Sequence, residues 1–249
     1  MSQDKRSILA QVDVLEREEQ YHKAEALLRN NVASLASDHE LGLRYALILV
    51  KLGRDRDAER TLRQLLSQHP DDTATLIALG RLLDNSLRTK EAETLYRSFM
   101  EKHPDSHEVM DELCQLLVSE DRKDEALESA RRHAMIYSTD YHAYDALRHV
   151  LMECSEDCQE ALDDEDDKET ALEMAASNLL EQLRVLGEVK SAVEHAPPDP
   201  AVRQELEEEA RRLLGEAEDL ERWSKWNKVR LPRGFKTEVA RVTGLVLSK

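Results

Sequence analysis

The feature that most constrains the fold is a residue pattern that returns every 34 positions along the first half of the chain. One phase of the pattern holds four alanines, Ala24, Ala58, Ala92 and Ala126. A second phase holds four leucines, Leu15, Leu49, Leu83 and Leu117. A third phase holds the small or medium residues Val12, Ala46, Gly80 and Cys114. Because several phases are kept together, one structural unit is predicted to recur along the chain.

Each unit is predicted to be two helices joined by a reversal. The stretch from Leu49 to Pro70 reads as a helix end, a turn, a second helix and a stop. Gly53 and Asn85 stand where the chain is expected to reverse after the first helix. Small residues such as Gly80 allow two helices to approach closely. A single unit cannot bury its apolar stripe, so the units are expected to stack.

This pattern resembles the tetratricopeptide repeat (TPR), a helix-turn-helix unit. The best match runs from Thr73 to Ser106, and its pattern positions are occupied by Leu76, Leu79, Gly80, Leu83, Ala92, Tyr96 and Pro104. The repeats span residues 5–38, 39–72, 73–106 and 107–140, and a partial fifth repeat spans 141–158. The resemblance implies an all-α TPR α-solenoid over residues 1–158.

The remainder of the chain is predicted to add an acidic linker at 159–168, a helical hairpin at 169–228 and a short basic amphipathic tail at 229–249. The hairpin is predicted from two heptad-like series of leucines and alanines, one on each side of a proline-rich turn at 195–200. It either caps the solenoid or pairs with a second copy.

The composition indicates which partners and which cellular location to expect. The formal net charge is −17, which argues against a general nucleic-acid binder, because affinity for phosphate requires clustered lysine and arginine. No stretch has the length and apolarity of a signal peptide or of a membrane span. The 3 cysteines do not resemble a disulfide framework. We therefore expect a cytoplasmic protein.

The basic tail has three interpretations. It is the packed end of the domain, or it contacts the acidic stretch or the groove of the same chain, or it binds RNA or an anionic surface. The residues that would carry the last function are Trp223, Lys225, Trp226, Lys228, Arg230, Arg233 and Lys236.

The resemblance also implies where a partner would bind. In TPR folds the first helices line a concave groove that holds a peptide or a partner's helix. The groove positions of highest interest are Leu43, Leu47, Val50, Ile77, Arg81 and Gln115. The alternative is that tighter winding or the tail buries the apolar members. Members that grip a C-terminal carboxylate use cations at fixed phases. Here Leu9, Asp13, Arg44, Ala74 and Ala78 occupy those phases, so such a clamp is not expected.

No motif indicates catalysis, a cofactor or a metal. There is no glycine-rich phosphate loop, nucleophile elbow or H-E-x-x-H sequence. Cys154 and Cys158, with His149 nearby, have zinc-compatible spacing but lack a recognisable fourth ligand. The predicted function is a non-enzymatic adaptor or chaperone-like scaffold that binds a protein segment in the groove. The alternatives are a self-assembling structural protein and an RNA or anionic-surface binder.

Overall fold

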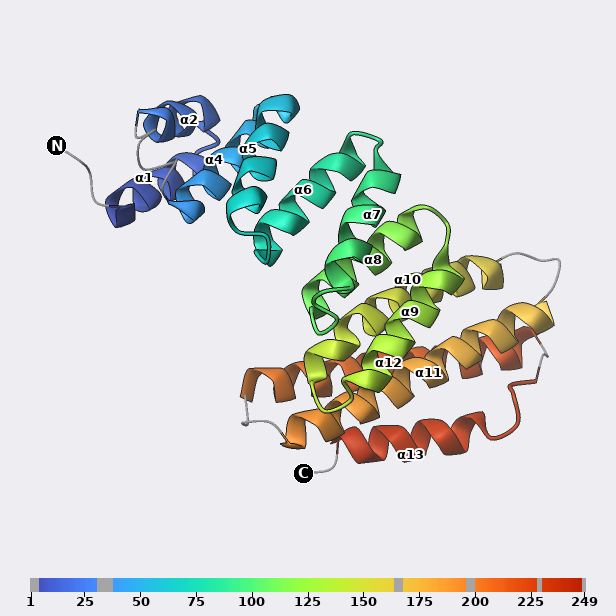
Figure 1. Ribbon diagram of the computed structural model, residues 1–249. Coiled ribbons are helices and arrows are strands. Elements are labelled where there is room, and N and C mark those ends of the chain that lie inside the picture. Colours follow the sequence, from blue (N-terminus) through green and yellow to red (C-terminus); the bar gives the residue numbers. More distant parts are fainter. Residues whose placement is uncertain (1–4, 31–37, 164–167, 196–199, 228–229, 248–249) are drawn as a thin grey trace. The chain divides into compact units, whose positions relative to one another are not determined.

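The computed structural model describes residues 5–30, 38–163, 168–195, 200–227 and 230–247, and every regular element within these ranges is a helix (Figure 1). The all-α class predicted from the sequence is confirmed. The chain divides into two compact units, Met1–Val109 and Met110–Lys249.

The first unit consists of antiparallel helix pairs. Helix α1 (Lys5–Arg17) packs on α2 (Tyr21–Arg29), α4 (His39–Lys51) on α5 (Asp55–Gln68), and α6 (Thr73–Asn85) on α7 (Thr89–Met100). Helix α2 also packs on α4, and α5 packs on α6, so each pair forms a wall for the next. The first helices α4 and α6 contact one another as well.

The reversal between the two helices of each pair depends on one left-handed residue. These residues are Glu19, Gly53, Leu87 and Asp121, with φ of 56°, 69°, 59° and 60°. The next backbone N–H donates to the carbonyl five residues earlier in the pairs Gln20–Leu15, Arg54–Leu49, Arg88–Leu83 and Arg122–Leu117, at 2.8–2.9 Å. This is the Schellman arrangement that closes a helix end. The repeated leucines therefore supply the carbonyl that ends each first helix.

The third reversal agrees with the predicted helix end but not with the predicted turning residue. Asn85 is still the last residue of α6, and Leu87 adopts the left-handed conformation instead. The physical reason is that the hydrogen bond to Leu83 fixes the position of the reversal. Leu87 therefore adopts the left-handed backbone conformation, which is unfavourable for leucine, and its side chain is 93% exposed.

Two arginines connect successive helix pairs of the first unit. Arg54 lies 3.2 Å from Glu25 of the preceding pair and 2.7 Å from Asp57 of its own helix. Arg88 repeats this arrangement with Glu59 and Glu91, at 2.7 Å each. The hydrogen bond from Arg88 lowers the pKa of Glu59. Because Arg54 and Arg88 directly follow the left-handed residues, the reversal also places these ion pairs.

The second unit contains the larger helical bundle. Helix α8 (His107–Ser119) begins before its boundary and is followed by α9 (Lys123–Ile136), a 3₁₀ turn (Tyr141–Tyr144) and α10 (Asp145–Asp163). Helices α11 (Lys168–His195), α12 (Pro200–Asn227) and α13 (Phe235–Leu247) complete it. Helix α11 packs on α10, α12 and α13, and α12 also packs on α13.

One segment differs from its sequence-based description. Helix α10 continues to Asp163, so residues 159–163 are helical, although the sequence assigns them to the acidic linker. Cys158 and Leu162 explain the extension, because both are buried and give this acidic segment an apolar side. In the tail, Phe235 and Val239 are buried, and α13 rests on α11 and α12. Residues 164–167 and 228–229 lie outside the described ranges.

Gly80 provides a direct test of the packing within a pair. A Cβ atom at Gly80 would lie 2.3 Å from both Cζ and the hydroxyl oxygen of Tyr96. We expect Gly80→Ala to lower the free energy of unfolding by about 1–3 kcal/mol in urea denaturation, through overpacking. The loss should be smaller in a Tyr96→Leu background, since alanine and leucine occupy the equivalent positions Ala46 and Leu62 of the preceding repeat.

Gly215 is the matched control for this substitution. It lies within α12, and an added Cβ atom would meet nothing within 4 Å. Gly215→Ala should therefore raise stability, by up to about 1 kcal/mol, through helix propensity alone. Equal effects of the two alanine substitutions would contradict the close approach of Gly80 to Tyr96.

Candidate interaction surfaces

An apolar stripe on α4 remains open within the first unit. Leu43, Leu47 and Val50 follow one another at helical spacing, so they share one side of α4. Leu47 is 38% exposed, and Leu43 and Val50 are half-buried. The buried residues Ile48 and Leu49 lie on other sides of the same helix. Helix α4 is thus apolar around most of its circumference, and its Leu47 side is accessible in this unit.

Helix α6 contributes the equivalent positions of the next repeat. Ile77 is half-buried and Arg81 is exposed, and Arg81 stands 34 residues after Leu47 in the same phase. Because α6 packs on α4, the two stripes belong to neighbouring helices. We refer to Leu43, Leu47, Val50, Ile77 and Arg81 as the α4–α6 face.

The single cation at the carboxylate-clamp phases is engaged within the first unit. Arg44 lies 2.9 Å from Asp13 and 3.1 Å from Glu16, both on α1. Two carboxylates already offset its charge, which leaves little attraction for the carboxylate of a partner. This geometry supports the sequence-based argument against a carboxylate clamp.

Gln115, the remaining predicted groove residue, lies in the second unit. It is exposed and donates a hydrogen bond to Asp111 at 3.0 Å. With Val118, His149 and Met152 it lines a hollow of about 450 Å³ along α8 and α10. His149 Nδ1 lies 2.7 Å from the Asp111 carboxylate, and this contact raises the pKa of His149. Gln115 is thus a predicted groove residue that lines a hollow of the second unit.

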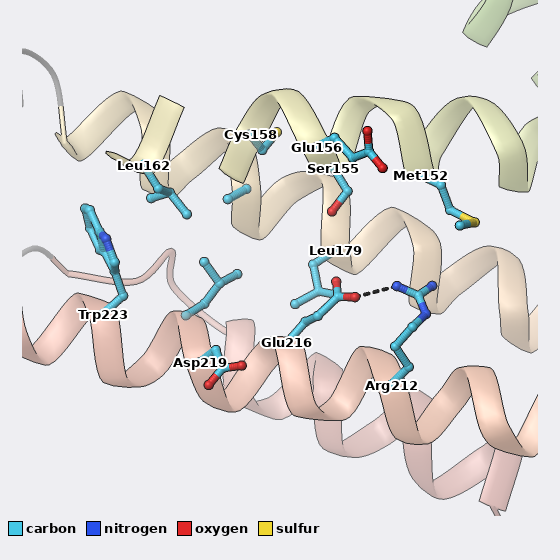
Figure 2. A pocket seen from close by; sticks show the side chains of 12 residues that line it. Met152, Ser155, Glu156, Cys158, Leu162, Leu179, Arg212, Glu216, Asp219 and Trp223 are labelled. Carbon is cyan, nitrogen blue, oxygen red and sulfur yellow. Dashed lines mark hydrogen bonds and ion pairs between the residues drawn. The ribbon is translucent and has the colours of Figure 1, made fainter. Parts of the chain in front are cut away.

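A second hollow, which the sequence analysis did not single out, lies between α10, α11 and α12 (Figure 2). Its volume is about 380 Å³. Figure 2 shows Trp223 and Leu162 at one end, Met152 and Arg212 at the other, and Leu179 between them. The leucine series in the predicted hairpin indicated that Leu179 packs. It gave no sign of a gap, because the gap depends on where α10 lies.

The structure divides the predicted basic tail into parts with different surroundings. Trp223 lines the second hollow, and Lys225 is exposed near the end of α12. Arg230 and Arg233 are exposed, whereas Lys236 forms an ion pair with Glu221 of α12. Lys228 and the side chain of Trp226 lie outside the described part of the chain. The packing of α13 favours the interpretation of the tail as the packed end of the domain.

The cysteines on α10 have the surroundings of packing residues. Burial raises the pKa of the Cys154 and Cys158 thiols, which disfavours the reactive thiolate. His149 is engaged with Asp111. Among the residues that the structure describes, no group of three or more potential ligands could hold a metal ion.

Comparison with known protein families shows to which family the repeats belong. The family model for the Psidin N-terminal TPR repeats region matches residues 6–175, more than half of the chain. The chain belongs to this family. TPR folds of this kind generally mediate protein–protein interactions and are generally non-enzymatic scaffolds. The match ends within α11, so α12 and α13 lie beyond it.

Several solved structures are similar to the chain at low sequence identity. A TPR protein from Parabacteroides merdae has a TM-score of 0.47 and 12% identity, covering 96% of this chain and 98% of its own. A thermophilic TPR protein from Thermus thermophilus has a TM-score of 0.43 and 15% identity, with coverages of 82% and 97%. MamA from MSR-1 has a TM-score of 0.40 and 17% identity, with coverages of 76% and 97%.

No curated protein sequence matches the chain significantly. Within the described ranges, no helix combines the length and the apolar character needed to cross a membrane.

The His149–Asp111 contact predicts a specific dependence of stability on pH. Since the pKa of His149 is raised in the folded chain, the contact stabilises fully below the unfolded pKa of about 6.5 and is lost as pH rises through the folded value. The unfolding free energy of wild type should exceed that of His149→Gln by more at about pH 6 than at about pH 9. Titration by NMR should show a lower pKa for His149 in Asp111→Asn, and an unchanged pKa would contradict the contact.

Proposed function

We propose that the chain is a non-enzymatic adaptor or chaperone-like module that binds a segment of another protein on the α4–α6 face. The observation that carries the proposal is the 38% exposure of Leu47 between the half-buried Leu43 and Val50. When a partner covers a large aliphatic side chain and its apolar neighbours, the burial of apolar surface favours binding. Central, well-surrounded apolar residues of this kind are where binding energy concentrates in interfaces.

The composition of the face indicates the chemistry of its partner. Three aliphatic side chains of α4 and Ile77 of α6 suit an apolar side of an amphipathic helix or extended segment. Arg81, exposed at the edge, adds guanidinium donors that orient a carboxylate or carbonyl of the partner. Because Arg44 is already paired, the anchor is side-chain burial and not recognition of a chain terminus.

Affinity capture with matched variants tests the proposal. Leu47→Glu places a carboxylate in the middle of the face, where burial of an unpaired charge is costly, and should weaken partner binding at least about tenfold. Leu87→Glu is the control, since it makes the same chemical change in the same unit at a side chain that is 93% exposed. A protein recovered with wild type and Leu87→Glu, and lost with Leu47→Glu, is the expected result.

Each contrary outcome has a defined meaning. If both variants retain the same proteins with unchanged affinity, the α4–α6 face does not bind them. If the chain itself is the species lost with Leu47→Glu, light scattering of the purified chain should show an oligomer, and self-assembly replaces the adaptor function. Circular dichroism of both variants shows whether the helices are intact, so loss of binding is separated from loss of fold.

A further inference from the structure

The hollow between α10, α11 and α12 combines an apolar interior with an acidic rim. Its interior holds six apolar residues and a cysteine, Met152, Cys158, Leu162, Ala175, Leu179, Leu220 and Trp223. Most of these side chains are buried, but Met152 is 45% exposed and Trp223 is half-buried. These two side chains are therefore partly accessible at the surface. Tryptophan and methionine are both enriched at binding surfaces, Trp as an anchor and Met as an adaptable contact.

The rim carries net negative charge. Glu156, Glu216 and Asp219 border the hollow, and Arg212 is its only cation among the lining residues described. Arg212 forms an ion pair with Glu216 and lies 3.8 Å from Glu209, so two carboxylates of α12 offset its charge. Asp219 pairs with Arg222 of the same helix, and both side chains of this pair are exposed. Glu156, on the opposite side, is exposed and has no ion pair with any described residue.

A part-buried ion pair joins the two walls of the hollow. Arg148 of α10 pairs with Glu209 of α12, and their side chains are only 20% and 13% exposed. This contact joins α10 to α12 about one turn before Met152 and Arg212 on their respective helices. Beyond it the floor is supplied by Ala175 and Leu179 of α11, which packs on both walls. The hollow is thus bounded by three helices of the second unit.

We propose that this hollow is a second docking site, and that its occupant is a cationic amphipathic segment of another protein. The occupant's apolar side chains would enter between Trp223 and Met152, and its lysines or arginines would face Glu156 and Asp219. Charge complementarity selects this occupant, because an anionic or neutral apolar ligand would gain nothing from the rim. The site is independent of the α4–α6 face, and α12, which supplies its rim, lies beyond the family match.

A defined peptide is a suitable probe. A fluorescein-labelled peptide of about 14 residues, with leucines at helical spacing and lysines elsewhere, presents the required surface. Two comparison peptides replace all lysines by glutamate or all leucines by alanine. Fluorescence polarisation of the full-length chain at about 0.15 M salt should show binding of the leucine–lysine peptide only. In a Trp226→Phe background, binding should also shift the emission of Trp223 to the blue.

Charge reversal with a matched control separates the site from general attraction to an acidic protein. Glu156→Lys/Asp219→Lys reverses two exposed rim carboxylates and should weaken peptide binding at least about tenfold. Glu173→Lys/Glu218→Lys makes the same change in net charge at exposed positions of α11 and α12 that do not line the hollow. The control pair should change affinity by less than about twofold at this salt concentration.

Three results would overturn the proposal. Equal weakening by the two charge-reversed pairs would mean that the peptide is held only by net charge. Equal binding of the alanine–lysine peptide would mean that the hollow contributes nothing. Self-association of the chain that disappears with Glu156→Lys/Asp219→Lys would make a second copy the occupant. Leu47→Glu should leave peptide binding unchanged, so a failure here is distinguishable from a failure of the α4–α6 face.

Discussion

The reversal after each first helix is the constraint on which the repeat architecture depends. A left-handed residue and the hydrogen bond that follows it turn the chain within a few residues, at positions 34 apart. The two helices then lie antiparallel and close, and each buries only part of its apolar surface on the other. The remaining apolar surface is covered by the next pair. Leu87 shows the strength of this requirement, since the reversal is kept there without glycine.

Electrostatics inside the fold shape what the surface offers to partners. Several arginines are used to connect helices: Arg44 joins α4 to α1, Arg54 and Arg88 join successive pairs, and Arg148 joins α10 to α12. Individually, exposed pairs of this kind contribute little stability, about 0–1 kcal/mol. Together, these pairs engage arginine side chains with carboxylates of the same chain, whose formal net charge is −17. The proposed second site follows from this balance, because its rim keeps the exposed carboxylate of Glu156, unpaired among the described residues, beside apolar side chains.

The sequence predicts the repeats well because their periodicity records contacts that recur in every unit. The alanine, leucine and small-residue phases correspond to helix packing and to the closing of each reversal, as Gly80 against Tyr96 illustrates. The ends of elements are predicted less well. Leu87 has no intrinsic preference for its conformation, and the acids at 159–163 indicate a linker, although Cys158 and Leu162 hold that segment in a helix. The hollow beside Trp223 arises from the spacing of three helices. The residue pattern along any one helix carries no information about that spacing.

Site-specific photocrosslinking can show whether the α4–α6 face binds a partner segment. A photoreactive phenylalanine analogue is placed at Leu47, or at Arg60, which is exposed on the second helix α5 of the same repeat. If the face binds the partner, the chain labelled at position 47 should form a covalent adduct with it, and the chain labelled at position 60 should not. Crosslinking from position 60 alone, or equally from both positions, would contradict binding at this face.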